Sequence, residues 1–239
     1  MCPHVGTSGW SYNHWVPSFY PPELPRSEWL GHYVSHFDTV ELNSSFYRLP
    51  FEGMVTGWNR RLPEGFHFVA KGPRRITHVQ RLAGVEANLE RFLARIEGVR
   101  ALRVLLWQLP PSFRFDPERL EQFLALLPAR MRHAFEFRHE SWWREETKAL
   151  LSRFGAAFAS ISHPRLPNDV VATSDFLYLR FHGTGRRLYD HDYSDSELLE
   201  WKARIEPHLP GRNLYAFFNN DVRAIAPRNA ARFRELLMA

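Results

Sequence analysis

Short apolar runs alternate along the chain with segments in which apolar residues recur every three or four positions. The short runs are rich in β-branched and aromatic residues and are bounded by glycine, proline or polar residues, as buried strands are. We expect strands at about residues 4–12, 37–47, 66–72, 102–111, 133–139, 156–163, 176–184 and 213–221. The amphipathic segments between them predict helices at about residues 25–37, 54–62, 84–99, 116–127, 144–155, 195–209 and 227–238.

Nearly every expected strand is followed by an expected helix. The exception is the segment 164–175, which is short and broken by prolines, so we expect an irregular connection between the sixth and seventh strands. This alternation implies parallel strands with right-handed crossovers, and eight such units close a (β/α)8 barrel. An open doubly wound sheet is the alternative, but GTSGWS after the first strand is neither a dinucleotide fingerprint nor a P-loop. We therefore predict an α/β fold with a single TIM-barrel domain over residues 1–239.

Polar residues interrupt the apolar strands at alternate positions near their carboxyl ends. In AFEFRH, for example, Phe135 and Phe137 alternate with Glu136 and Arg138. Successive side chains of a strand point to opposite faces, so phenylalanines that contact the helices direct the charged pair into the barrel. The same reasoning predicts further inward polar residues near strand ends, which are Glu41, Asn43, Lys71, Gln108, Arg180, His182, Asn219 and Asp221.

Barrel enzymes hold their active sites at this end of the strands. We interpret the inward residues as a polar pocket for an anionic, phosphate-containing ligand, in a protein that is either an enzyme or a binding protein. Lys71, Arg138 and Arg180 would clamp the anion with charge-assisted hydrogen bonds. Glu41 and Glu136 would orient those cations or act as general base, and His182 would transfer protons.

The remaining ligand-binding candidates are Trp10, Tyr12, Asn43, Gln108, Asn219 and Asp221. The structural alternative is that the charged residues form internal ion pairs that only close the core, for instance Glu136 with Arg180.

The loops that follow the strands are expected to add a rim of arginines and aromatic residues. The arginines are Arg74, Arg75, Arg165, Arg186 and Arg187, and the aromatic residues include Trp15, Trp142, Trp143, Tyr189 and Tyr193. Such a surface suits phosphates and stacked bases, so nucleic-acid binding through this rim is a second hypothesis. The formal net charge of +5 and the sequence pI of about 9.6 also favour an anionic partner.

Cys2 is the only cysteine, which excludes an intrachain disulfide and agrees with a reducing compartment. No apolar run approaches the roughly 20 residues of a membrane span, and we find no secretory signal. We therefore expect a cytoplasmic location and no membrane partner. No cofactor is evident. Glu41, Glu136, His163, His182 and Asp221 could bind a metal ion, so a metal-dependent phosphoesterase is a third hypothesis.

Several motifs, taken in order, resemble one known family. They are GTSGWSY, FDTVELNSSFYRLP, FVAKGPRRITH, QLPPSF, FEFRHESW, YLRFHG and FFNND, and they run from about residue 5 to about residue 236. The chain is similar to the YecE-like family, domain of unknown function 72, which implies a TIM barrel. Trp107 departs conservatively from the phenylalanine that the family has more often. The family is distantly similar to metal-dependent DNA-repair endonucleases, but their multi-histidine motifs are not visible in this sequence.

Overall fold

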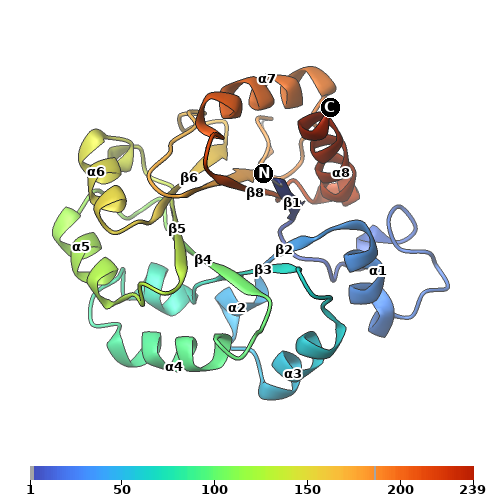
Figure 1. Cartoon of the computed structure of the whole chain (residues 1–239), viewed down its shortest axis with the longest axis horizontal. Coiled ribbons are helices and arrows are strands. Elements are labelled where there is room, and N and C mark those ends of the chain that lie inside the picture. The colour runs from blue at the N-terminus through green and yellow to red at the C-terminus, as the bar shows by residue number, and fades with distance from the viewer. Residues whose placement is uncertain (1–2, 186) are drawn as a thin grey trace.

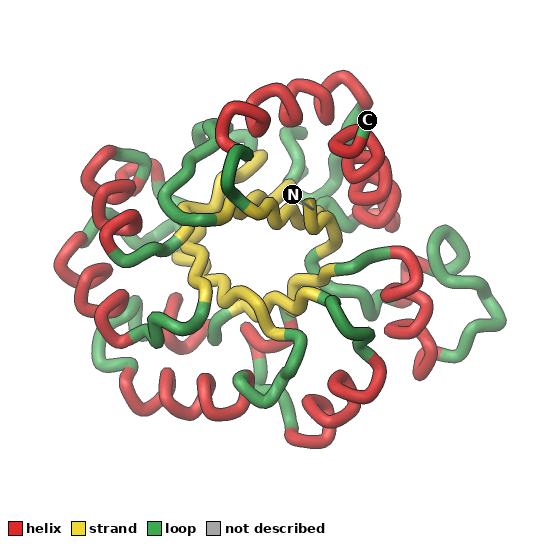
Figure 2. Tube along the Cα trace, viewed as in Figure 1, coloured by secondary structure: helices red, strands yellow, loops and turns green. Residues whose placement is uncertain are grey.

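The computed structural model describes residues 3–185 and 187–239 and has one eight-stranded sheet ringed by helices (Figures 1 and 2). The strands are β1 (Pro3–Thr7), β2 (Thr39–Leu42), β3 (His67–Lys71), β4 (Leu102–Leu109), β5 (Arg132–Phe137), β6 (Ala157–Ser162), β7 (Phe176–Phe181) and β8 (Asn213–Phe218). The helices are α1 (Trp29–His36), α2 (Ser44–Tyr47), α3 (Glu52–Arg61), α4 (Glu86–Ile96), α5 (Pro117–Leu126), α6 (Glu145–Arg153), α7 (Asp195–Ile205) and α8 (Ile225–Met238). The strands pair in parallel in the order β1-β8-β7-β6-β5-β4-β3-β2, which confirms the expected barrel.

The barrel closes where β1 meets β2, and the backbone bridge between these two segments lies at the carboxyl end of the seam. A parallel bridge joins Ser8 to Glu41, and the Gly9 N–H donates to the Glu41 carbonyl at 2.8 Å. Lower in the seam the hydroxyl of Tyr33, from α1, accepts from the Thr7 N–H and donates to the Thr39 carbonyl, both at 3.0 Å. A side chain thus satisfies backbone groups that a continuous ladder would otherwise pair.

Two separate apolar clusters follow the alternation of each strand. The inner cluster fills the barrel with Val69, Val104, Leu106, Ala134, Ala157, Ala159, Phe176, Tyr178, Tyr215 and Phe217. The outer cluster packs strand residues such as Phe68, Phe135, Phe137, Leu179, Phe181 and Phe218 against the helices. Glu136 therefore has the same orientation as the inner cluster, as expected from the sequence.

The connection between β6 and β7 contains no helix, as expected for residues 164–175. Several short helical turns were not expected, and two of them bear on the site, namely α2 and a five-residue π-type turn at Arg75–Val79 that follows β3. Both lie immediately after strand ends, so they place Phe46 and His78 beside the mouth of the barrel.

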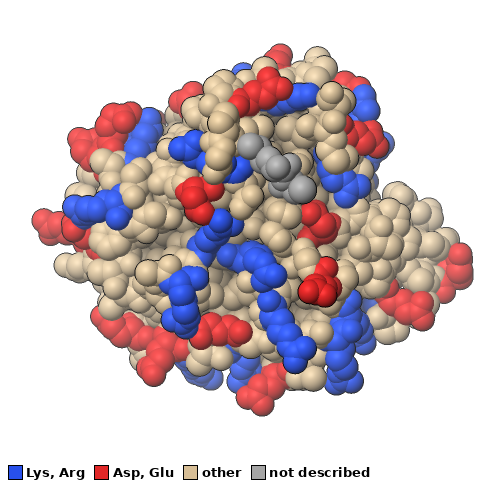
Figure 3. Space-filling view, viewed as in Figure 1, with Lys and Arg blue, Asp and Glu red and all other residues tan. Residues whose placement is uncertain are grey.

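Basic side chains form a band across the middle of the face seen in Figure 3, with acidic side chains beside it. Among the described residues, no helix has both the length and the apolar character that crossing a bilayer requires.

Candidate functional site

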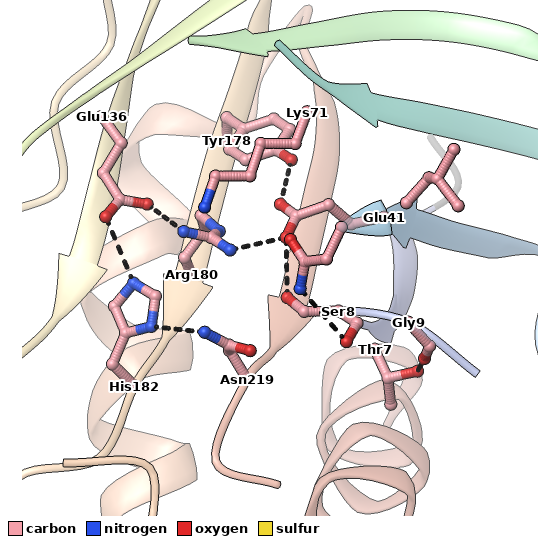
Figure 4. Close-up of polar contacts among 12 residues, drawn as sticks. Thr7, Ser8, Gly9, Glu41, Lys71, Glu136, Tyr178, Arg180, His182 and Asn219 are labelled. Carbon is pink, nitrogen blue, oxygen red and sulfur yellow. Dashed lines mark hydrogen bonds and ion pairs between the residues drawn. The ribbon is translucent and has the colours of Figure 1, made fainter. Parts of the chain in front are cut away.

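A network of buried charged side chains occupies the carboxyl end of the barrel interior (Figure 4). Its centre is Arg180, whose side chain is 1% exposed. Arg180 Nη2 donates to Glu41 Oε1 at 2.6 Å, and Nη1 donates to Glu136 Oε2. Glu41 lies on β2, Glu136 on β5 and Arg180 on β7. The guanidinium of Arg180 therefore joins three strands. Burial of two carboxylates requires a partner of this kind.

Both carboxylate oxygens of Glu41 are occupied. Oε1 also accepts from the Ser8 hydroxyl at 2.7 Å, and Oε2 accepts from the Tyr178 hydroxyl at 2.5 Å. Burial, followed by the negative charge of Glu41, raises the pKa of Tyr178 well above its ordinary value, so the phenol stays a donor. Glu41 is therefore both a counter-ion of Arg180 and part of the seam that closes the barrel.

Glu136 connects the network to groups nearer the mouth. Its Oε1 accepts from Arg138 Nε and lies 3.5 Å from His182 Nε2. Burial alone would raise the pKa of Glu136, but the charges of Arg138 and Arg180 hold it well below its ordinary range. Glu136 is thus a carboxylate at neutral pH and fixes the position of Arg138.

His182 is a neutral imidazole in this setting, because burial and then the Arg138 charge lower its pKa well below the ordinary value. Arg138 Nη2 lies 2.9 Å from His182 Nε2, and a guanidinium can only donate, so Nε2 is the acceptor. The ring proton is then on Nδ1, which lies 3.2 Å from the Asn219 amide. Asn219 must present its oxygen there, an assignment made from the hydrogen-bond network.

Lys71, at the end of β3, stands apart from these pairs. The two carboxylates of the network are already paired with Arg138 and Arg180, and within residues 3–185 and 187–239 the Lys71 amine has no hydrogen-bond or ion-pair partner. Its Nζ lies 4.2 Å from the centroid of the Phe46 ring. Desolvation, followed by repulsion from Arg180, lowers the pKa of Lys71 to about 7 (Figure 4). A substantial fraction of this amine is therefore neutral at physiological pH.

Two cavities at the mouth share Lys71, Tyr47 and Tyr189 in their lining. The first measures about 740 Å³ and is lined also by Tyr12, His14, Asn43, Asn219 and Asp221. The second measures about 660 Å³ and is lined also by Arg74, Arg138, Arg165, His78, His163 and Gln108. The side chain of Lys71 therefore reaches both spaces.

Comparison with known proteins identifies the family. Residues 4–239 match the family described as "Protein of unknown function DUF72". The chain belongs to this family. The UPF0759 protein YecE of Escherichia coli (strain K12) is 28% identical over 239 residues, covering 98% of this chain and 77% of the relative.

Solved structures agree with this family and with the barrel fold. A DUF72 family protein from Thermotoga maritima MSB8 is 33% identical and superimposes with a TM-score of 0.91, covering all of both chains. An AP endonuclease, family 2, from Brucella melitensis superimposes with a TM-score of 0.57 at 11% identity, covering 98% of this chain and 99% of that one. At that identity the likeness concerns the fold alone.

The residues predicted from sequence fall into two groups in this DUF72 barrel. Those that line a cavity are Tyr12, Asn43, Lys71, Gln108, Arg138, Asn219 and Asp221. Those that form the buried network and are absent from the cavity linings are Glu41, Glu136, Arg180 and His182. The buried group positions one cation of the cavity group, Arg138, through Glu136 and His182.

Trp10 and Asp221 have surroundings that strand parity did not anticipate. Trp10 packs edge-on against Trp58 and Phe68, at 6.3 and 6.2 Å between ring centroids, in the outer apolar layer. Asp221 follows the end of β8 and accepts from Trp15 Nε1 at 2.6 Å. Burial raises the pKa of Asp221 to about 6. Neither side chain contacts the buried network.

The rim of arginines and aromatic residues is only partly present. Arg74 and Arg165 line the second cavity, whereas Arg75 and Arg187 are exposed outside both cavities. Arg186 lies outside the described residues. Of the expected aromatic residues, Tyr12 and Tyr189 line a cavity, while Trp15, Trp142 and Tyr193 are buried in the core.

Tyr178, Ser8, Phe46 and His78 are among the residues of the site that sequence reasoning missed or gave no role. Tyr178 was detectable, because it has the same strand parity as Arg180. Ser8, Phe46 and His78 lie beyond the strand ends, where alternation no longer predicts orientation. Among the described residues, no three His, Cys, Asp or Glu side chains are grouped so that they could hold a metal ion. In this arrangement the two buried carboxylates bind guanidinium groups.

We expect replacement of Lys71 by methionine to stabilise the protein by on the order of 1–2 kcal/mol at neutral pH, allowing for solvent in the cavities. The folded pKa of about 7 lies below the ordinary value of 10.5, so the charged amine costs stability below pH 7 and the cost vanishes as pH rises towards 10.5. Urea unfolding of both proteins between about pH 6 and pH 10 measures this difference. A variant less stable than the wild type at pH 6 would indicate an ion pair at Lys71.

Proposed function

We propose that this protein binds an anionic, phosphate-bearing ligand at the mouth of the barrel. The observation that carries the proposal is the lining of the second cavity, which among the described residues includes four basic side chains, Lys71, Arg74, Arg138 and Arg165, and one carboxylate, Glu140. Its volume of about 660 Å³ is in the range of small-molecule sites. Convergent cations in a concave site favour a phosphate group over a neutral ligand.

Arg138 is the best-positioned of these cations. Its hydrogen bonds to Glu136 and His182 use two of its five N–H groups, which leaves donors for a ligand. Because buried partners hold the guanidinium in place, little conformational freedom is lost when an anion binds.

Two histidines of the cavity, His78 and His163, provide hydrogen bonds rather than charge. Burial lowers the pKa of His78 to about 4, assisted by the nearby charge of Lys71. Burial and then Arg138 likewise lower the pKa of His163 to about 4. At neutral pH these two histidines therefore add no positive charge to that of the lysine and the arginines.

The buried residues support this site indirectly. In our proposal Glu136 orients Arg138, and Arg180 neutralises both Glu136 and Glu41. Arg180 does not contact the ligand, because its side chain is 1% exposed and carboxylates occupy two of its nitrogens.

Replacing both Arg74 and Arg165 by alanine is expected to weaken binding of a phosphorylated sugar by about 100-fold or more, because each charge-assisted hydrogen bond contributes roughly 1.5–3 kcal/mol and the double variant removes two of them. Isothermal titration calorimetry with ribose 5-phosphate measures the affinity. The matched control replaces Arg60 and Arg61, at the end of α3, which removes the same charge outside both cavities. Equal affinities of the two double variants, or no binding to the wild type, would contradict the proposal.

A nucleic acid is the second candidate ligand. It is supported by the net charge of +5 and by the fold that this chain shares with a protein named AP endonuclease. Burial of Trp15 and Trp142 removes two of the stacking surfaces that this hypothesis uses. Affinity for an oligonucleotide that falls steeply with salt would support it, and no retention at low salt would reject it.

A further inference from the structure

Lysine is rare in this chain, and one of the few lysines is at the centre of the site. The sequence has three lysines, Lys71, Lys148 and Lys202, against 28 arginines. Arginine therefore provides nearly all of the positive charge, including the three guanidiniums of the second cavity. If Lys71 served only to attract an anion, arginine would serve as well or better. An amine differs from a guanidinium in that it can lose its proton and act as a nucleophile.

The other two lysines are bound to neighbouring groups, whereas Lys71 is not. Lys148 Nζ donates to Glu145 Oε1 at 2.7 Å, and Lys202 Nζ donates to the Leu236 carbonyl at 2.8 Å. Within the described ranges, the Lys71 amine has no hydrogen-bond or ion-pair partner. Its Nζ lies over the Phe46 ring, 4.2 Å from the centroid, and the residue lines both cavities. It is thus the one described lysine whose amine is both unbonded and open to a ligand.

We propose that Lys71 is a nucleophile that forms a Schiff base with the aldehyde or ketone group of a phosphorylated carbonyl compound. This inference rests on the proposed function, because the arginines of the second cavity would hold the phosphate while the carbonyl carbon lies at Lys71.

The chemistry needs no oxidant, reductant or metal. The lone pair of the neutral amine forms a bond to the carbonyl carbon, and the carbonyl π electrons move to oxygen. The resulting carbinolamine loses its oxygen as water together with both amine protons, which leaves a C=N double bond to the lysine nitrogen. Protonation of this imine by solvent then gives an electron-withdrawing iminium group.

The surroundings favour the neutral amine. Desolvation and the charge of Arg180 on β7 lower the pKa of Lys71 to about 7, and Arg138 acts in the same direction. Glu136 on β5 and Glu41 on β2 oppose the shift, but arginines already pair with both. A desolvated lysine beside a fixed cation is a known way to activate an amine.

In this proposal His78 moves protons during dehydration. Its ring lies 4.9 Å from the Phe46 ring, the same ring that Lys71 contacts, and it lines the second cavity with Lys71. It is neutral at physiological pH, so one ring nitrogen can accept a proton while the other donates.

Borohydride trapping tests the inference on the full chain. The protein is incubated with glyceraldehyde 3-phosphate, reduced with sodium borohydride and analysed by peptide mass spectrometry. We expect an adduct at Lys71 in at least about 10-fold higher yield than at Lys148, Lys202 or the terminal amine, and a yield that rises through about pH 7 rather than near the usual lysine pKa. No adduct at Lys71, or equal adducts at all the amines, would overturn the inference.

Two further arms separate this inference from the proposed function. Unphosphorylated glyceraldehyde should label Lys71 about 10-fold less well, because it lacks the group held by the arginines. Equal labelling would support the carbonyl chemistry and reject the phosphate site. Calorimetric binding of ribose 5-phosphate without any trapping at Lys71 would support the anion site and reject the Schiff base. Lys71→Met should lose the adduct while the adducts at the other amines persist.

Discussion

Replacing Arg180 by methionine is expected to lower the free energy of unfolding by about 3–5 kcal/mol. The substitution removes the guanidinium that pairs with both Glu41 and Glu136 and leaves two fully buried carboxylates, one without any cation. The carboxylates then protonate or draw water into the barrel, and both responses cost free energy. Urea unfolding followed by tryptophan fluorescence gives the free energy and its change.

The matched control is Arg165→Met, which removes an exposed arginine of the same mouth and should change stability by less than about 0.5 kcal/mol. Adding Glu41→Gln to Arg180→Met removes the carboxylate that has lost its only cation and should restore part of the loss. If Arg180→Met and Arg165→Met had the same stability, the buried network would not hold the strands together. A structure of the Arg180→Met variant would also show whether Arg138 keeps its position when Arg180 is absent.

Replacing Gly6 by alanine is expected to destabilise the protein by about 3 kcal/mol or more, because it overpacks the seam between β1 and β2. A Cβ at this position would lie 2.3 Å from the Thr39 carbonyl oxygen and 3.0 Å from the Tyr33 hydroxyl. The carbonyl belongs to the backbone and cannot rotate away. The clash would separate the strands that carry Ser8 and Glu41, so it would also disturb the site.

Gly53→Ala is the control for this prediction. Gly53 lies in α3, and a Cβ there meets no atom within 4 Å. Alanine in a helix is favoured over glycine by about 0.5–1 kcal/mol, so this variant should be slightly more stable than the wild type. Comparable urea midpoints for Gly6→Ala and Gly53→Ala would show that the seam relaxes without cost.

The barrel could be predicted because its signals are local. Alternation within strands and the 3.6-residue period of helices depend on near neighbours in sequence, and eight strand–helix units leave few topologies. The absence of a helix before β7 followed in the same way from the prolines at 164 and 167. The same alternation directed Glu41, Glu136 and Arg180 into the barrel, where they lie buried.

The prediction was less informative where regular structure ends. Trp10 and Asp221 lie beyond the ends of β1 and β8, so the parity that directed Asp221 inward did not predict their partners, which come from other segments of the chain. The tryptophans of the expected rim illustrate the same limit. Trp142 donates its Nε1 proton to the Phe113 carbonyl at 2.7 Å and is fully buried, which no pattern within its own loop indicates.

The sequence by itself determined the strand and helix order, the family, and which polar residues share the interior of the barrel, because side-chain direction in a strand is set by its period of two. Only the tertiary structure decided which of these charges neutralise one another. Arg138 and Arg180 pair with the two carboxylates, and Lys71 is left beside two cavities with an amine that has no partner among the residues that the structure describes. Which charges pair and which stay unpaired depends on distances between strands that are far apart in sequence. In a low-dielectric interior those distances set both the stability of each charge and its pKa.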